Sequence, residues 1–184
     1  MSELNFEGLL SRFERFPGVL QAVAVGVDDD NAKWRPPLPE GTTEGPFGGG
    51  WSIVEVVAHL ADEEEADFSV RLKSTLEDPS NAWPPIDPEG WAIERDYRSR
   101  SLNGEISRFG VERARNLVWL RELGDETEWG RAYDHPQIGS LRAGDLLGAW
   151  CTHDWLHMRQ IVKRMYQLTQ RDVDGFSTAY AGEW

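Results

Sequence analysis

Three of the four histidines in this 184-residue chain have a spacing that suits a metal site. His153 and His157 lie four residues apart in CTHDWLHMRQI, and His59 lies far upstream in WSIVEVVAHLADEEE. On a helix, residues i and i+4 project from nearly the same face, one turn apart. Two such imidazoles can bind one ion, and a third from a neighbouring helix would leave a coordination position open for a reacting molecule. The histidines therefore predict a reactive divalent metal site.

The same residues also have a simpler interpretation, because an inward-facing histidine is often a hydrogen-bonded core residue. His157 falls on the apolar stripe of its helix, and Val56 and Leu60 place His59 on the inward side of another. This coincidence on the inner faces of two helices favours the metal, but the packing interpretation stays open.

Glu63 is the carboxylate best placed to act beside His59, because it follows one helical turn later. It could be a fourth ligand, fix the tautomer of a ligand imidazole through a hydrogen bond, or move a proton in a reaction. It also belongs to the acidic run from Asp62 to Glu65, and such a run favours a solvated face.

Three other polar residues have less to do with the predicted ion. Asp154 could support a ligand or form an interhelical salt bridge, and the sequence leaves both open. His135 lies in a polar segment and is expected at the surface or anchoring a loop. Cys151 points elsewhere on the helix than His153 and is expected to be a small buried residue rather than a nucleophile.

Four amphipathic helices would position these residues. Apolar side chains at helical spacing indicate helices over about residues 4–25, 52–77, 91–123 and 140–170. Pro17 lies inside the first and predicts a kink or a break. Ser52, followed three residues later by Glu55, predicts a capping box at the start of the second.

Long connections rich in Pro, Gly or polar residues separate the helices, at residues 28–50, 78–90 and 125–140. No strand-like alternation, internal repeat or second domain is evident. The sequence therefore predicts one all-α domain over residues 1–184, an antiparallel four-helix bundle with long Pro/Gly-rich connections. Four tryptophans are candidates for the walls of an apolar pocket: Trp51, Trp83, Trp91 and Trp150.

Composition narrows the function classes. The formal net charge of -13 opposes nucleic acid and anionic membranes, so neither is expected as a partner. One cysteine excludes an intrachain disulfide. The segment MSELNFEGLLSRFERF lacks the basic start and apolar run of a signal peptide, so we expect a cytoplasmic protein.

Two separated segments resemble the DinB-like family of metal-binding four-helix bundles. They are WSIVEVVAHLADEE and HPQIGSLRAGDLLGAWCTHDWLHMRQI. The family pattern has a Trp-Ser helix start, a histidine one to two turns later, and an HDxxHxxQI-type helix near the C-terminus. The resemblance covers residues 51–162 and places the family's three histidines at His59, His153 and His157. It implies one divalent ion (Ni, Zn, Fe or Mn), a long crossover connection and a homodimer.

The resemblance also implies a range of functions. The family includes thiol-dependent S-transferases and a mycothiol-dependent isomerase, and its name derives from damage-inducible expression. We therefore expect a metal-dependent enzyme that acts on small molecules, with a low-molecular-weight thiol as co-substrate, or a hydrolytic variant that uses water. The alternatives are a non-catalytic metal-binding or stress-response module, and a structural bundle in which the histidines only pack.

Overall fold

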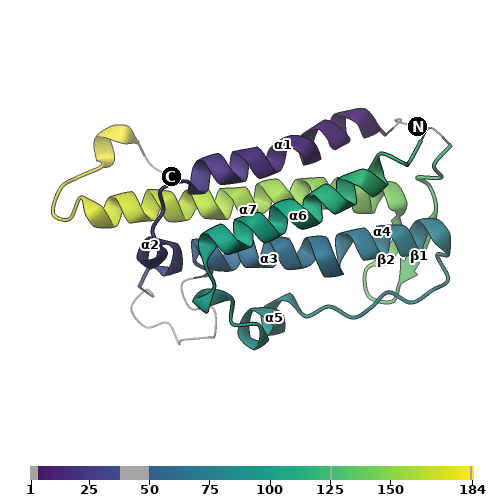
Figure 1. Cartoon of the computed structure of the whole chain (residues 1–184), viewed down its shortest axis with the longest axis horizontal. Helices are drawn as coiled ribbons and strands as arrows, with labels where there is room; N and C mark the ends of the chain where they lie inside the picture. The colour runs from purple at the N-terminus through teal and green to yellow at the C-terminus, as the bar shows by residue number, and fades with distance from the viewer. Residues whose placement is uncertain (1–3, 38–49, 125, 183) are drawn as a thin grey trace.

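The structure is a computed structural model that describes residues 4–37, 50–124, 126–182 and 184. Long helical segments pack side by side as a four-helix bundle (Figure 1), which confirms the predicted fold class. The segments are α1 (Phe6–Ala24), α3 (Ile53–Ala66) continued by α4 (Phe68–Glu77), α6 (Leu102–Leu120) and α7 (Ala143–Asp172). Smaller elements lie in the connections and after α7: α2 (Asp29–Lys33), α5 (Pro88–Glu94), η1 (Tyr97–Ser99), β1 (Ala132–His135) and β2 (Gly139–Arg142) in the connections, and η2 (Ala179–Ala181) after α7.

The helices do not simply alternate in direction. α3 contacts α6 and α7, and α1 contacts the same two helices. α1 and α7 run one way along the bundle, whereas α3–α4 and α6 run the other way (Figure 1). α3 and α6 can be parallel neighbours because residues 78–101 cross back along the bundle between them. This segment is the long crossover that the family resemblance implies.

α1 continues through Pro17, so of the kink or break expected there, the break does not occur. Proline has no N–H to donate to the carbonyl four residues earlier, which is that of Phe13. Arg113 Nη1 from α6 donates to the Phe13 oxygen instead, at 3.3 Å. The helix therefore tolerates the proline because a side chain from a neighbouring helix replaces the missing donor.

The second predicted helix is two helices. Its start is as expected, with Ser52 and Glu55 forming the capping box, and its end at Glu77 is also confirmed. The chain leaves helical geometry at Asp67, where φ is -121° and ψ is -91°. α4 follows at once, so α3 and α4 are separated by a single non-helical residue.

The third predicted helix starts too early, because residues 91–101 are not one continuous helix with α6. Asp87 caps the short α5, and Asp96 adopts a left-handed φ of 46° that ends it. Ser101 then caps α6, its hydroxyl accepting from the Gly104 N–H. Within the predicted long connection 28–50, α2 is helical, and residues 38–49 lie outside the described residues.

The third predicted connection contains β1, and β2 runs from it into the predicted start of the fourth helix, so α7 begins at Ala143 rather than near residue 140; neither strand was predicted. β1 and β2 pair antiparallel, with Ala132 opposite Arg142 and His135 opposite Gly139. The strands are four residues each, too short for an alternating pattern to stand out. Gly139 has a φ of 81°, a left-handed value that glycine adopts without steric cost. The hairpin leads directly into α7.

A buried cation joins the helices at the centre of the bundle. Arg113 is 0% exposed and donates to Glu64 of α3 at 2.7 Å and to Asp154 of α7 at 2.9 Å. Trp150 Nε1 donates to the same Glu64 carboxylate at 2.6 Å. Of the two roles left open for Asp154, the structure thus shows the interhelical salt bridge.

A candidate three-histidine metal site

The three histidines singled out in the sequence meet between α3 and α7. His59 projects from α3, and His153 and His157 project from α7 one turn apart. The Nε2 atom of His59 lies 3.4 Å from that of His153 and 3.1 Å from that of His157. The Nε2 atoms of His153 and His157 are 2.9 Å apart. All three imidazoles therefore present the same ring nitrogen to one point.

These distances suit a shared ion. Nitrogen atoms bound at 2.0–2.1 Å to a tetrahedral ion lie about 3.3 Å from one another, close to the three observed separations. Hydrogen bonding alone cannot account for the triangle. A ring nitrogen of a neutral imidazole is either a donor or an acceptor. Among three mutually adjacent nitrogens, at least one pair must then be donor–donor or acceptor–acceptor.

The imidazoles are in the protonation state that metals bind. Burial, followed by the neighbouring imidazoles, lowers the pKa of His59 to about 2. Burial also lowers the pKa of His153 to about 3, with His157 and Arg113 adding to the shift. The pKa of His157 is lowered by burial as well. At neutral pH all three rings are uncharged, so their lone pairs are available as ligands.

Gln160 orients one of these rings. His157 Nδ1 lies 2.8 Å from Gln160 Oε1, one turn later on α7. An amide oxygen can only accept, so this contact places the proton of His157 on Nδ1 and leaves Nε2 free to bind a metal. The sequence analysis did not single out Gln160, although its i+3 spacing from His157 was a usable signal.

Glu63 lies on the other side of the His59 ring from the triangle. Its Oε1 atom is 3.6 Å from His59 Nδ1, and its residue exposure is 4%. Burial, and then a hydrogen bond that protonated Glu63 donates to Asp67, raise the pKa of Glu63 to about 9. Asp67 in turn forms an ion pair with Arg71 at 2.6 Å. These residues continue His59 along α3 and α4 as a buried polar row.

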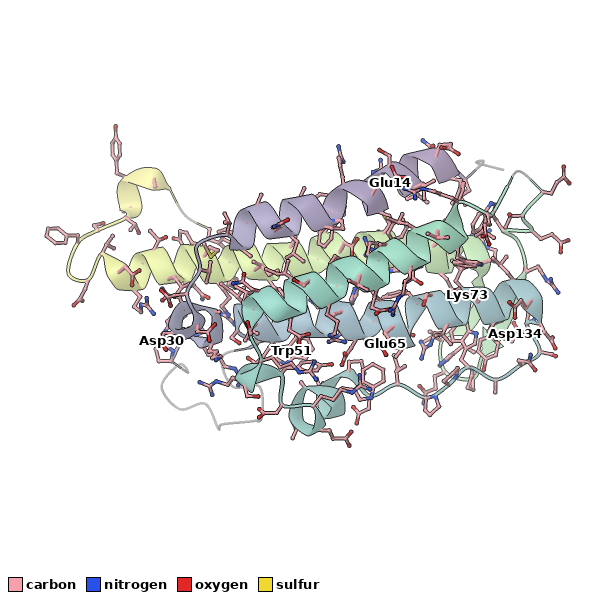
Figure 2. All side chains as sticks on the ribbon, in the orientation of Figure 1. Glu14, Asp30, Trp51, Glu65, Lys73 and Asp134 are labelled. Carbon is pink, nitrogen blue, oxygen red and sulfur yellow. The ribbon has the colours of Figure 1, made fainter. Side chains whose placement is uncertain are left out.

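The expectation of a solvated acidic face is therefore wrong for three of its four residues. Asp62, Glu63 and Glu64 are buried, and only Glu65, labelled in Figure 2, is exposed. Asp62 pairs with Arg108 at 2.6 Å and Glu64 with Arg113 at 2.7 Å, whereas the raised pKa of Glu63 keeps that carboxyl group protonated. The acidic run suggested a solvated face in the sequence because the arginines that pair with Asp62 and Glu64 come from distant segments of the chain.

Aromatic rings cover the triangle. Trp51, just before α3 (Figure 2), lies 4.7 Å from the His59 ring and stacks 6.4 Å from that of His157. Phe68 of α4 lies 5.0 Å from the His153 ring. Phe68 reaches the site because the break at Asp67 redirects the chain, which the sequence did not reveal.

The other tryptophans proposed as pocket walls lie elsewhere. Trp150 is buried and stacks on Phe68 at 6.1 Å, so it touches the site only indirectly. Trp83 stacks on Tyr133 of the hairpin at 4.2 Å. Trp91 packs beneath the Arg95 guanidinium at 4.3 Å.

His135 and Cys151 stay outside the triangle, as expected. His135 is in β1, half-buried, with its ring 5.8 Å from Trp83. Cys151 is buried, and burial raises the pKa of its thiol, which opposes a nucleophilic role at neutral pH.

A cavity of about 240 Å³ opens beyond Trp51 and Gln160, and the three histidines are not among its described lining residues. Its described lining includes Trp51 and Gln160, the residues that contact His59 and His157. The site thus adjoins a space in which a small molecule can lie.

No described helix has an apolar stretch long enough to span a bilayer.

Known proteins resemble the chain in sequence and in fold. The "Putative metal-dependent hydrolase OB0782" of Oceanobacillus iheyensis is 32% identical over 115 residues, which are 61% of this chain and 64% of that protein's length. YfiT of Bacillus subtilis, which carries the same description, is 28% identical over 64% of this chain and 67% of its own.

Solved structures agree on the architecture. The structure of YfiT, described as a four-helix bundle of unusual topology, has a TM-score of 0.75 at 22% identity, covering 92% of this chain and 90% of that one. A mycothiol-dependent maleylpyruvate isomerase has a TM-score of 0.60 at 17% identity, covering 85% of this chain and 62% of that one. A family model matches residues 12–161, a segment that includes all three histidines of the triangle. This chain therefore belongs to the DinB superfamily.

Proposed function

We propose that this protein is a metal-dependent enzyme that activates a small nucleophile on a divalent ion held by His59, His153 and His157. The observation that carries the proposal is the convergence of three neutral imidazole nitrogens within 3.4 Å of one another. A divalent ion held there would supply Lewis acidity, which lowers the pKa of a water or a thiol that it binds. Three protein ligands are the number typical of catalytic rather than structural zinc sites.

The surrounding residues prepare the site for this role. Gln160 holds the tautomer of His157, and we assign Glu63 the corresponding role toward His59 Nδ1. Glu63 is then a positioning residue, because it lies on the side of the ring away from the triangle. Trp51 and Phe68 limit the access of bulk water to the histidines.

We favour a thiol as the nucleophile. Neutral ligands leave the full charge of a divalent ion to stabilise a thiolate, and the mycothiol-dependent isomerase supports thiol chemistry on this fold. In such a transfer the sulfur bonds to an electrophilic carbon, the leaving group departs with the bonding pair, and the thiol proton passes to solvent. The candidate substrates are a low-molecular-weight thiol and a small electrophile.

Hydrolysis is the second candidate, and the descriptions of OB0782 and YfiT support it. In that case water replaces the thiol, with the same residues in the same roles. A protein that binds metal without turnover remains the non-catalytic alternative. Thiol transfer and hydrolysis differ in the nucleophile on which the rate depends.

The test compares thiol transfer with hydrolysis on the same metal-loaded protein. The rate with 1-chloro-2,4-dinitrobenzene is followed with and without cysteine, and the rate with p-nitrophenyl acetate is followed without thiol. We expect a thiol-dependent rate that is lost in His153→Ala. A rate with the ester alone, lost in the same variant, would select hydrolysis. Equal rates for wild type and variant with both substrates would contradict an enzymatic role for the site.

A further inference from the structure

The Trp51 side chain connects the three-histidine site with the crossover over residues 78–101. Its ring lies 4.7 Å from that of His59 and stacks 6.4 Å from that of His157. The same side chain packs against a small buried apolar cluster that includes Ala92 and Tyr97 of the crossover. Whatever holds the crossover in place therefore also acts on the ring that covers two of the three histidines.

The crossover returns along the first part of α3. Its short helix α5 and the turn η1 both contact that helix (Figure 1). Ala92 of α5 and Tyr97 of η1 are both buried, and they share their cluster with Ala58 of α3, the residue before His59. This part of the crossover is therefore packed onto the helix that carries one of the three histidines.

Asp62 of α3 is the polar anchor of this contact. It is 1% exposed and lies about one turn after His59. Arg95 Nη1 donates to its carboxylate at 2.6 Å, and the Tyr97 hydroxyl donates to the same carboxylate oxygen. Because the carboxylate is charged and shielded from water, both contacts are stronger than ordinary surface hydrogen bonds.

The backbone at Asp96 lets both of its neighbours reach Asp62. Asp96 has a left-handed φ of 46°, a conformation that aspartate adopts more readily than most residues. Arg95 and Tyr97, on either side of it, then meet one carboxylate. A left-handed residue other than glycine persists where the surrounding contacts fix it. The two contacts with Asp62 are such a constraint.

Asp62 also has a partner outside the crossover. Arg108 Nη1 of α6 lies 2.6 Å from the other oxygen of the carboxylate, and Arg108 Nη2 donates to the carbonyl oxygen of Ala58 at 3.0 Å. Asp62 would thus keep a cationic partner if both of its crossover contacts were removed. The crossover can therefore be released from α3 without leaving a buried charge unpaired, which would itself destabilise the fold.

We propose that Asp62, Arg95 and Tyr97 are positioning residues for the three-histidine site. They hold the crossover on α3, and the crossover in turn keeps the Trp51 ring against the two histidine rings that it contacts. With the indole in place, the imidazole planes are fixed and bulk water is kept from the ring nitrogens. This inference rests on the proposed function only for the role of the histidines as metal ligands.

The double variant Arg95→Met/Tyr97→Phe removes both crossover contacts with the anchor. Methionine can keep an apolar stem over Trp91, which the Arg95 guanidinium now covers at 4.3 Å, and phenylalanine keeps a ring in the cluster. The matched control is Arg98→Met/Tyr133→Phe. It makes the same two chemical changes at an exposed arginine of the crossover and at a tyrosine of β1.

Proton NMR of the histidine rings in the metal-free protein reports the position of Trp51. An indole shifts the resonances of protons in a ring packed against it, and this shift is lost when the indole moves away. Trp51→Leu gives the resonance positions without the indole. His135, which lies outside the triangle beside Trp83, is the internal reference. The chain has four histidines, so each resonance can be assigned by substitution.

We expect the His59 and His157 resonances of Arg95→Met/Tyr97→Phe to move toward their positions in Trp51→Leu. The control should leave them at their wild-type positions. In the Trp51→Leu background the same double change should move them no further, because it acts through that ring. The inference is overturned if the resonances stay in place, if the control moves them as far, or if they move equally in the Trp51→Leu background.

Zinc affinity, measured by competition with a chromophoric chelator, is the second readout. Arg95→Met/Tyr97→Phe should bind zinc about tenfold more weakly than wild type, the lower end of the range for residues that support metal ligands. The loss should be absent in the Trp51→Leu background. An equal loss in both backgrounds would show that the contacts support the fold in general, and it would contradict the positioning role.

The two readouts separate this inference from the proposed function. Wild-type protein that takes up no zinc, while its histidine resonances respond as expected, would contradict the proposed function and leave the positioning of Trp51 intact. Zinc uptake that is the same in wild type and double variant, with unmoved resonances, would do the reverse.

Discussion

The orientation of the three histidine rings, the proposed metal ligands, depends on residues outside the triangle of their Nε2 atoms. Gln160 holds the His157 ring through a 2.8 Å contact to Nδ1. Residues in this position typically account for 10–100-fold in metal affinity. Gln160→Ala should therefore weaken zinc affinity by about 10–100-fold, as measured by competition with a chromophoric chelator. Gln170→Ala, an exposed glutamine on the same helix, should leave the affinity unchanged, and an equal loss in both variants would refute the assigned role.

Glu63 makes stability depend on pH in a direction that can be tested. Its pKa is raised from 4.5 to about 9, so in the folded protein it stays protonated while the unfolded chain ionises. The stability that Glu63 gives the folded state through this difference in pKa is fully present below pH 4.5, and it is lost progressively as the pH rises toward 9. In the metal-free protein, Glu63→Gln should therefore stabilise the fold more at pH 8 than at pH 5.

Urea unfolding at the two pH values measures this difference. Glu65→Gln is the control, because the Glu65 side chain is 60% exposed. A Glu63→Gln effect that is the same at both pH values, or that shrinks as pH rises, would show that Glu63 is ionised in the fold.

The sequence predicted which three histidines converge, but not the residues that hold their rings in place. His153 and His157 are linked by local helix geometry, and His59 was assigned by its inward face and by the family pattern. Phe68 and Glu63 could not be placed, because their positions depend on how α3 and α4 pack against distant arginines and on the break at Asp67. Local spacing predicts which face a residue occupies, whereas burial of a charge depends on partners far away in the chain.

Among the elements, α6 contributes the residue that holds the bundle together. Removing Arg113 would leave Glu64 and Asp154 buried without their shared cation. Breaking a buried ion pair on one side typically costs 3–5 kcal/mol. Arg113→Met, which keeps much of the volume, should lower the free energy of unfolding by about 3–5 kcal/mol in denaturant titrations.

Arg115→Ala is the matched control on the same helix, because its side chain is 70% exposed in its pair with Glu112. It should change the stability by less than about 1 kcal/mol. Equal effects of the two substitutions would contradict the central role of Arg113. A stabilised Arg113→Met would show that the buried charges are a net cost to the fold.

The start of a helix could be predicted where neighbouring residues determine it. Whether a helix continues or is interrupted could not be predicted. The capping box at Ser52 involves residues three apart, so the sequence contains it entirely. The uninterrupted α1 depends on Arg113 reaching the carbonyl of Phe13, a contact between residues 100 positions apart. The left-handed Asp96 that separates α5 from α6 has no pattern of its own in the sequence.

On the scale of the whole molecule, an ion at the three histidines would join α3 to α7 and stabilise the folded chain. A ligand at 100 times its Kd adds about 2.7 kcal/mol, and each kcal/mol raises Tm by about 2–4 °C at this size. Adding zinc to chelator-treated protein should therefore raise Tm by about 5–10 °C. The shift should be absent in His153→Ala, and an equal shift there would show that the metal binds elsewhere.

The bundle as a whole was predictable because four amphipathic segments without long strands allow few architectures. The parallel packing of α3 and α6 was not a matter of periodicity, since helical patterns have no direction. The family resemblance implied a long crossover without placing it, and Figure 1 shows residues 78–101 crossing along one side of the bundle. The hairpin was missed because its strands are too short to carry a pattern.

Elemental analysis of untagged wild-type protein beside His153→Ala tests the three-histidine metal site itself. We expect close to one divalent ion per wild-type chain and essentially none in the variant, because three imidazoles would share one ion. Wild-type protein that stays metal-free after exposure to Ni, Zn, Mn and Fe(II) would contradict it. So would a variant that holds as much metal as the wild type.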